Sequence, residues 1–445
     1  MSSQFTVHSS HAARDHENNG SNVAVTVMPI ALPAPGTELS TVNCELVRRE
    51  KLHTLRGCPR GCIPSAGMER RAQVERLRRL IDSGGRTVLV TGAAGIGKTT
   101  VIEQALEDAD RAVYSTVCDP LDPPIPNRPF LSLLPDPDDA LIEALGSGDR
   151  DTASDMVMNA TTTGILVIDD AQWIDQASAE LAAHVSQSIS GNSTSLIVSY
   201  DPAHSSPSLG SLVEAATGTE RLEVPPLSVA EIAGMLPAGM DAQETLDATG
   251  GNALLVRETA SVGTPTLDLR SIVLARFDTL TISTREIVEA LAVSATGTAH
   301  RLLDRMHPGW KTNLAPAEEA RLLSISPSVV RFEHELIRRV VLDEMTEMRR
   351  RFLHQRILEH LDESTDAAVM AAHAEGAGDV EAIAEAGKRA AHEASRARSH
   401  VEAVGQLRRI LRYEHSLDET LRSRLRDDLE REVALMESSS TPELG

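Results

Sequence analysis

The stretch that most constrains the fold of this chain is the octapeptide GAAGIGKT, from Gly92 to Thr99. It follows a short apolar run, residues 87–90, that has the length of a buried strand, and it precedes helical patterning that continues to about residue 108. A glycine-rich turn between a strand and a helix directs backbone N–H groups and the positive end of the helix dipole toward one point. The spacing matches G-x-x-x-x-G-K-[ST], and it predicts a P-loop that binds nucleotide phosphates.

Each position of this loop has an expected chemical task. Lys98 supplies a mobile positive charge for the β- and γ-phosphates, and the Thr99 hydroxyl is a Mg²⁺ ligand. We therefore expect ATP and Mg²⁺ as the cofactors. The candidate nucleotide-binding residues are Gly92, Ala93, Ala94, Gly95, Ile96, Gly97, Lys98, Thr99 and Thr100.

A P-loop needs an acidic partner for the metal at the end of another buried strand. The run ILVI at residues 165–168 ends in Asp169 and Asp170. We expect Asp169 to hold Mg²⁺, directly or through water, and Asp170 to polarise the attacking water. The candidate catalytic residues are thus Lys98, Asp169 and Asp170.

Strand and helix patterns alternate in the first half of the chain. Further apolar runs at 112–117 and 195–200 indicate strands, and the proline-rich stretch 120–137 indicates a loop. Strands that alternate with helices predict an α/β domain, a parallel sheet with helices on both faces. After about residue 220 strand patterns become rare and amphipathic helices dominate, with a helix expected to begin at Ser228 after a Pro-Pro pair.

The composition narrows the possible partners. The 445-residue chain has a formal net charge of −22, which argues against broad nucleic-acid binding because that affinity comes mainly from Lys and Arg at phosphates. No segment approaches the roughly 20 apolar residues that span a bilayer, so we expect a soluble, cytoplasmic protein with no membrane contact. A zinc site can be drawn from Cys44, Cys58, Cys62 and His53, but its spacing fits no standard pattern, and reduced thiols are the simpler interpretation.

Several stretches, in order, resemble one family of P-loop proteins. DDAQWID at 169–175 resembles the extended second motif of the AAA-related, STAND-type ATPases of large LuxR-type transcriptional regulators. GMER at 67–70, PPLS at 225–228 and GGNA at 250–253 resemble the family's opening segment, the start of its lid and its Gly-Gly-Asn-Pro motif. RFEHELIR at 331–338, His354, and AAHAEGAGD at 371–379 resemble its later segments.

This resemblance implies a nucleotide switch with slow ATP hydrolysis, in which the ATP and ADP states differ in how the lid and the winged-helix segment pack on the P-loop domain. It divides the chain into a P-loop ATPase domain (67–220), an all-α lid (221–280), a winged-helix-like segment (281–362) and tetratricopeptide-like helical repeats (363–436). Residues 1–66 are expected to be a poorly structured extension and 437–445 a tail. Nothing here resembles the family's DNA-binding end, so we expect no direct DNA binding from this chain.

Three positions depart from the family pattern: Met68 interrupts the opening segment, Ala253 replaces the proline of Gly-Gly-Asn-Pro, and the third bears on the chemistry. Where the family often has an arginine that senses the γ-phosphate, after the strand at 195–200, this chain has Asp201. A carboxylate there removes a favourable charge and adds an unfavourable one, so turnover and γ-phosphate sensing are in doubt. The resemblance also offers His334 as a phosphate contact, although a histidine packed on a helix is the simpler interpretation.

Other functions remain compatible with the sequence. The chain could be a P-loop enzyme, such as a small-molecule kinase or a remodelling ATPase, or a degenerate nucleotide-binding scaffold, which Asp201 permits. For the C-terminal helices, with packing positions such as Ala390, Ala403 and Leu407, we expect either a site for a protein partner or effector, or a simple helical cap. Transcriptional control through a partner or through a DNA-binding domain absent from this chain is the expected output.

Overall fold

The computed structural model describes residues 70–439 apart from 135–136, 190–192, 205, 216–218, 263–268 and 363. The extension predicted over residues 1–66 lies outside the described residues, and so do Cys44, Cys58, Cys62 and His53 of the possible zinc site.

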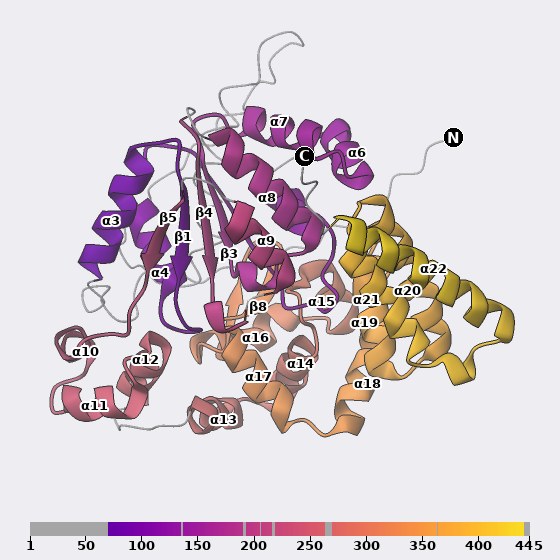
Figure 1. Cartoon of the computed structure of the whole chain (residues 1–445). Helices are drawn as coiled ribbons and strands as arrows, with labels where there is room; N and C mark the ends of the chain where they lie inside the picture. The colour runs from indigo at the N-terminus through magenta and orange to yellow at the C-terminus, as the bar shows by residue number, and fades with distance from the viewer. Residues whose placement is uncertain are drawn as a thin grey trace, which may run out of the picture. The chain divides into compact units, whose positions relative to one another are not determined.

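Five parallel strands form the sheet of the P-loop domain (Figure 1), in the order β2–β3–β4–β1–β5. The strands are β1 (Thr87–Thr91), β2 (Val113–Val117), β3 (Ile165–Asp169), β4 (Ser195–Tyr200) and β5 (Glu220–Glu223). Strand β1 pairs with β4 on one side and β5 on the other, so that Val88 lies between Ile197 and Glu220. The carboxyl ends of all strands therefore meet at one edge, which brings the P-loop after β1 next to the ends of β3 and β4.

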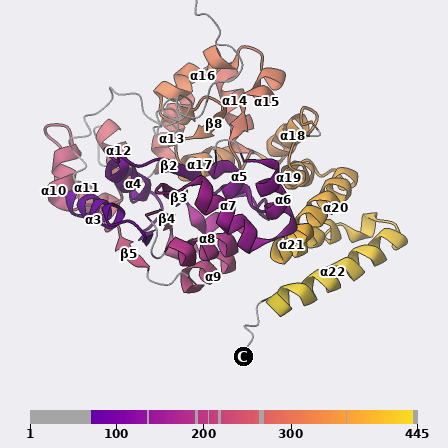
Figure 2. The ribbon, with the colours of Figure 1, turned by 90° about the horizontal axis from the view of Figure 1, so that it is seen from above.

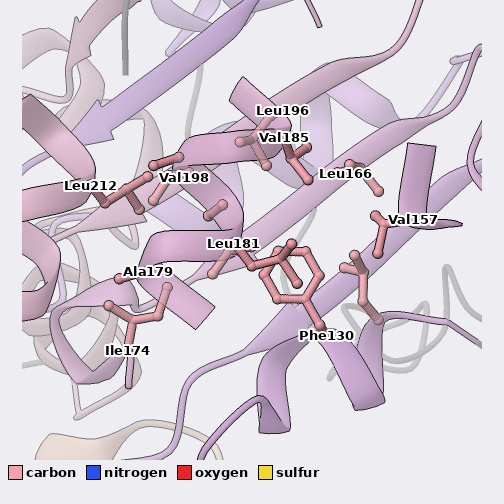
Figure 3. Packing of buried hydrophobic residues seen from close by; sticks show 14 of the residues in the cluster. Phe130, Val157, Leu166, Ile174, Ala179, Leu181, Val185, Leu196, Val198 and Leu212 are labelled. Carbon is pink, nitrogen blue, oxygen red and sulfur yellow. The ribbon is translucent and has the colours of Figure 1, made fainter. Parts of the chain in front are cut away.

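Alternate strand residues point to opposite faces of this sheet and build two cores. One face packs Val88, Val90 and Val167 against α3 (Arg71–Asp82) and α4 (Lys98–Leu106). The other face packs Leu166, Leu196 and Val198 against a second group of helices (Figure 3). These helices are α5 (Arg128–Leu133), α6 (Asp139–Ser147), α7 (Arg150–Ala160), α8 (Gln176–Ile189) and α9 (Pro207–Ala215). The predicted α/β fold with helices on both faces is confirmed.

Two elements differ from the prediction made from sequence. The region 120–137, predicted as a loop, contains α5, and Pro129 lies in its first turn, where a missing N–H removes no helical hydrogen bond. Phe130 and Leu133 hold this short helix in the core. Strand β5 is not predicted either, because its sequence ERLE has a single apolar residue, Leu222, which is buried while its neighbours are exposed or half-buried.

Three short helices follow the sheet: α10 (Val229–Met235), α11 (Ala242–Thr249) and α12 (Ala253–Val262). The predicted start at Ser228 is confirmed, since Ser228 and Glu231 form a reciprocal capping box for α10. Gly250 ends α11 in the left-handed conformation, with φ of 58°. Leu227, Ile232 and Val256 close a small core of their own.

A helical segment with a small antiparallel sheet comes next, and its sheet order is β6–β8–β7. Its helices are α13 (Leu269–Thr279), α14 (Ile282–Ala292), α15 (His300–Met306), α16 (Trp310–Glu319), α17 (Glu335–Glu344) and α18 (Glu347–Leu358). Its strands are β6 (Thr298–Ala299), β7 (Leu323–Ile325) and β8 (Val329–Phe332). Trp310 is the largest side chain buried in this core, and its indole N–H donates to Asp304 at 2.8 Å.

The remaining helices are α19 (Ala367–Ala377), α20 (Val380–Arg396), α21 (His400–Leu411) and α22 (Glu419–Ser439), and each packs on the one before it (Figure 2). The predicted packing positions Ala390, Ala403 and Leu407 are buried. None of the described helices combines the length and the apolar character that spanning a membrane requires.

A pair of imidazoles, the buried ring of His373 and the half-buried ring of His354, joins α18 to α19. Nδ1 of His354 lies 3.0 Å from Nδ1 of His373, so one ring donates and the other accepts. Burial lowers the pKa of His354 to about 4, and burial with the neighbouring imidazole lowers the pKa of His373 to about 3. Both rings are therefore neutral in the folded protein at neutral pH.

This pair predicts a pH-dependent stability. An unfolded histidine titrates near 6.5, so between about pH 6.5 and pH 4 the unfolded chain binds more protons than the folded one. The contribution of this pair to stability is therefore largest above about pH 6.5 and is lost as the pH falls. We expect the two histidines to lower the free energy of unfolding by roughly 2 kcal/mol between pH 7 and pH 5.5. Urea denaturation of the double variant His354→Gln/His373→Gln should show a much smaller drop. The exposed His392→Gln is the control, and an unchanged pH dependence in the double variant would contradict this prediction.

Candidate phosphate and metal site

All three glycines of the P-loop have positive φ, and Gly95 and Gly97 form its turn. Gly95 has φ of 74° and Gly97 has φ of 101°, and Gly97 directly precedes α4. A Cβ on Gly95 would lie 3.0 Å from Oδ1 of Asn252, so this position lacks space as well as conformational freedom for a larger residue. The turn thus leaves the N-terminus of α4 facing the loop, as anion binding requires.

Lys98 is buried and folded back onto the loop. Its ammonium group donates to the carbonyl of Gly92 at 3.0 Å and to that of Ala93 at 3.3 Å. Carbonyl oxygens are weaker partners for an ammonium group than phosphate oxygens are, because charge-assisted bonds to an anion are the stronger ones. Lys98 is therefore placed to exchange these contacts for phosphate.

Thr99 and Asp169 meet as the two motifs predict. The Thr99 hydroxyl donates to Oδ2 of Asp169 at 2.7 Å, and the Ser199 hydroxyl donates to Oδ1 of the same carboxylate. Burial, and then the charge of Asp170, raise the pKa of Asp169, while Ser199, Thr99 and Lys98 act in the opposite direction. A buried carboxylate held in this way gains by binding a cation.

Asp170 is half-buried at the same strand end and has a left-handed backbone, with φ of 54°. Its N–H donates to the Ser199 hydroxyl at 3.2 Å, and its Oδ1 accepts from the side-chain amide of Gln172 at 3.0 Å. The carbonyl oxygen of that Gln172 amide accepts from the backbone N–H of Asp201 at 3.1 Å. The side chain of Gln172 thereby connects the ends of β3 and β4.

Asp201 turns its side chain toward the P-loop. Its Oδ2 accepts from the backbone N–H of Ala94 at 3.1 Å and lies 3.0 Å from Nδ1 of His204. Burial acts to raise its pKa, but the N–H of Ala203, His204 and the charge of Lys98 together lower the pKa below its usual value. The carboxylate at this position is therefore ionised at neutral pH and lies within the field of Lys98.

Two further side chains hold the carbonyl groups of the loop. Arg70, which is only 2 % exposed, donates to the carbonyl of Ile96 at 2.7 Å and also bonds the carbonyl of Pro225. The side-chain amide of Asn252 donates to the carbonyl of Ala94 at 2.9 Å, and the N–H of Leu254 donates to that of Gly95 at 2.9 Å. The segments before the sheet and after it thus bind the P-loop backbone directly.

His334 lies at the start of α17 and caps it. Its Nδ1 accepts from the N–H of Leu336 at 3.1 Å. Burial, followed by the charges of Arg257 and Lys98, lowers its pKa to about 4. The imidazole is therefore neutral, and it is close enough to Lys98 and Asp169 for their charges to act on it.

The side chains present fit a nucleotide with Mg²⁺. Among the described residues, no group of three or more His, Cys, Asp and Glu side chains is arranged to hold a metal ion alone. Mg²⁺ at nucleotide sites usually takes one or two protein oxygens and completes its shell with phosphates and water. Thr99 and Asp169 supply that minimal set beside Lys98.

The sequence motifs do not predict the contacts of Ser199 and Gln172 with the acidic residues at the ends of β3 and β4. They do not predict the contacts of Asn252 and Arg70 with the P-loop either. A hydrogen bond of Ser199 could have been predicted, because a polar residue inside the apolar strand 195–200 needs a buried hydrogen-bond partner. The contacts of Arg70 and Asn252 depend on the packing of distant segments, and the spacing of residues carries no such information.

Comparisons with known proteins assign a family to part of this chain. The family model described as "AAA ATPase domain" matches residues 68–198. The chain carries an AAA-type P-loop ATPase domain. Domains of this family bind nucleotides, usually with Mg²⁺. No curated protein sequence matches the chain.

Solved structures similar to the chain include a signal transduction ATPase with numerous domains (STAND) with a tetratricopeptide repeat sensor from Pyrococcus horikoshii. The identity is 13% and the TM-score 0.50, with 86% of this chain and 65% of that chain covered. This chain therefore spans less than two thirds of the length of that protein. The Orc1 protein of Aeropyrum pernix in complex with DNA also matches, with 12% identity, a TM-score of 0.30, and 63% of this chain and 94% of that chain covered.

The contacts of Ser199 generate a prediction for Ser199→Ala. Without the Ser199 hydroxyl, the Asp169 carboxylate keeps its hydrogen bonds from the Thr99 hydroxyl and the N–H of Asp170 but loses the third, at a cost of about 1 kcal/mol. We expect the nucleotide affinity measured with Mg²⁺ to fall roughly threefold to tenfold, and the affinity without Mg²⁺ to stay unchanged. Ser186→Ala is a matched control, since it removes a buried hydroxyl bonded to Thr87 rather than to Asp169. Equal losses with and without Mg²⁺ would contradict an orienting role.

Proposed function

We propose that this chain is an ATP-binding signalling switch of the STAND type, with slow ATP hydrolysis. In this proposal, Lys98 and residues 92–100 bind the phosphates, Thr99 and Asp169 hold Mg²⁺, and Asp170 orients the attacking water. The observation that carries the proposal is that side chains from outside the sheet bind the P-loop backbone itself, above all Asn252 at Ala94. A ligand that changes the conformation of this loop must therefore also change how the segment that carries Asn252 packs on it.

A chain of contacts extends from that segment to α17. Arg257 on α12 bonds Glu333 at 3.2 Å, and Glu258, which is buried, pairs with Arg257 and Arg276. Glu333 directly precedes His334, the cap of α17. Buried charges are costly to separate from their partners, so α12, α13 and β8 should move together rather than singly. On this basis we propose the predicted ranges 221–280 and 281–362 as lid and winged-helix-like units of the switch, with two adjustments. Residues 221–223 belong to β5 of the sheet, and Val273 of α13 packs in the core of the second unit.

The C-terminal helices are the proposed site of a protein partner or effector. They are docked on the ATPase domain through the N-terminus of α8, where Oε1 of Glu402 accepts from the N–H of Gln176 at 2.8 Å and the Ser399 hydroxyl accepts from that of Ala177 at 3.2 Å. Gln176 directly follows the DDAQWID segment. A change in this docking can therefore reach Asp169 and Asp170 through the short stretch 171–175. The resemblance of the sequence to LuxR-type regulators supports transcription as the output, exerted through such a partner.

The function is tested first at Lys98. We expect Lys98→Ala to weaken ATP binding by at least about a hundredfold and to abolish turnover, because the charge that faces the phosphates is lost. Isothermal titration and phosphate release measure the two effects on the full chain. The exposed Lys388→Ala is the control. Slow turnover that depends on Lys98 supports the switch, rapid turnover that a small acceptor stimulates points to an enzyme such as a kinase, and tight binding without turnover points to a scaffold.

The docking of the C-terminal helices gives a second test. Glu402→Ala with Ser399→Ala removes two bonds to the N-terminus of α8, which shifts the docked equilibrium by about 2 kcal/mol, or roughly thirtyfold. We expect faster limited proteolysis between the ATPase domain and the C-terminal helices and a higher rate of ATP turnover. Glu381→Ala, an exposed carboxylate on α20, is the control. Unchanged proteolysis would show that these contacts do not hold the helices in place.

A further inference from the structure

Asp201 directly follows β4, at the edge of the sheet that carries the P-loop. Strand β4 runs between β1 and β3, so the residue that follows β4 lies between the P-loop and Asp169. Both groups that act on terminal phosphates, Lys98 and the metal pair Thr99 and Asp169, border this space. Through Gln172, Asp201 is also connected to Asp170, the proposed water-orienting residue.

The structure also fixes the direction and the charge of the Asp201 side chain. It is 4 % exposed, and it points at the N–H of Ala94, the middle of the P-loop turn. Its pKa is below the usual value, so it carries a full negative charge there. The backbone N–H of Ala94, which the loop could offer to a phosphate oxygen, is thus occupied by an anion of the protein itself.

On these grounds we infer that Asp201 makes the P-loop prefer a nucleoside diphosphate to a nucleoside triphosphate. This inference rests on the proposed nucleotide binding at Lys98. A third phosphate brings additional negative charge into the space that Asp201 borders, and it must either displace the carboxylate from Ala94 or accept repulsion at short range. The phosphates of a diphosphate, which remain within the loop and the N-terminus of α4, avoid most of this cost.

The test compares two ligands on the full chain. Isothermal titration with Mg²⁺ measures the Kd of ADP and of β,γ-methylene ATP, which cannot be hydrolysed. We expect wild type to bind ADP at least about tenfold more tightly. Asp201→Asn keeps an acceptor for the N–H of Ala94 but removes the charge, so it should tighten binding of the triphosphate about tenfold while changing that of ADP less than roughly threefold.

Further variants separate charge from shape. Asp201→Glu keeps the charge and should keep the preference for ADP, whereas Asp108→Asn, an exposed carboxylate of the same domain, should change neither affinity. Equal affinity of wild type for both ligands, or equal changes for both in Asp201→Asn, would overturn the inference while leaving nucleotide binding intact. Absence of binding of either ligand by wild type, or binding unaffected by Lys98→Ala, would instead overturn the proposed function.

Discussion

The backbone of the P-loop needs hydrogen-bond partners whether or not a phosphate is present, because unpaired buried N–H and C=O groups are costly. In this structure the protein supplies them. Ala94 donates its N–H to Asp201 and accepts from Asn252, while Arg70 binds the carbonyl of Ile96. A nucleotide that binds here competes with or rearranges these bonds. The segments that provide them are therefore coupled to the ligand through the loop itself.

The coupling extends in two directions because the loop lies at an edge of the sheet where several strands end. Toward the proposed lid, Asn252 begins the segment that contains Arg257 and Glu258, whose ion pairs reach Glu333 and Arg276. Toward the C-terminal helices, the acidic end of β3 continues through residues 171–175 to the N-terminus of α8, where Glu402 is bound. Burial and the charge of Asp175 raise the pKa of Glu402 to about 7. The charge of this carboxyl group therefore changes with pH near neutrality.

The parts of the fold that were predictable from sequence are those in which the local pattern decides the structure. Strand β3 is apolar at every position before Asp169, and β4 is buried along its length, so short apolar runs identify both. Strand β5 is an edge strand with polar residues on its exposed side, and its position depends on pairing with β1. Helix α5 begins after Asn127, whose backbone N–H binds Asp175, a contact between residues 48 positions apart. Local patterns do not contain such information.

In the candidate site too, local motifs predict some features, whereas others depend on how distant segments pack. Lys98, Thr99 and Asp169 follow from two motifs, and the structure brings them together as predicted, although their roles remain proposals. The sequence also indicated that Asp201 stands where a related protein would have an arginine. It could not indicate that the carboxylate binds the N–H of Ala94, since that depends on the order in which β4 and β1 pair. An anion at this edge thus does more than remove a favourable contact, because it gives the N–H of Ala94 a partner within the protein. On the inference above, a terminal phosphate either displaces that partner or is repelled by it.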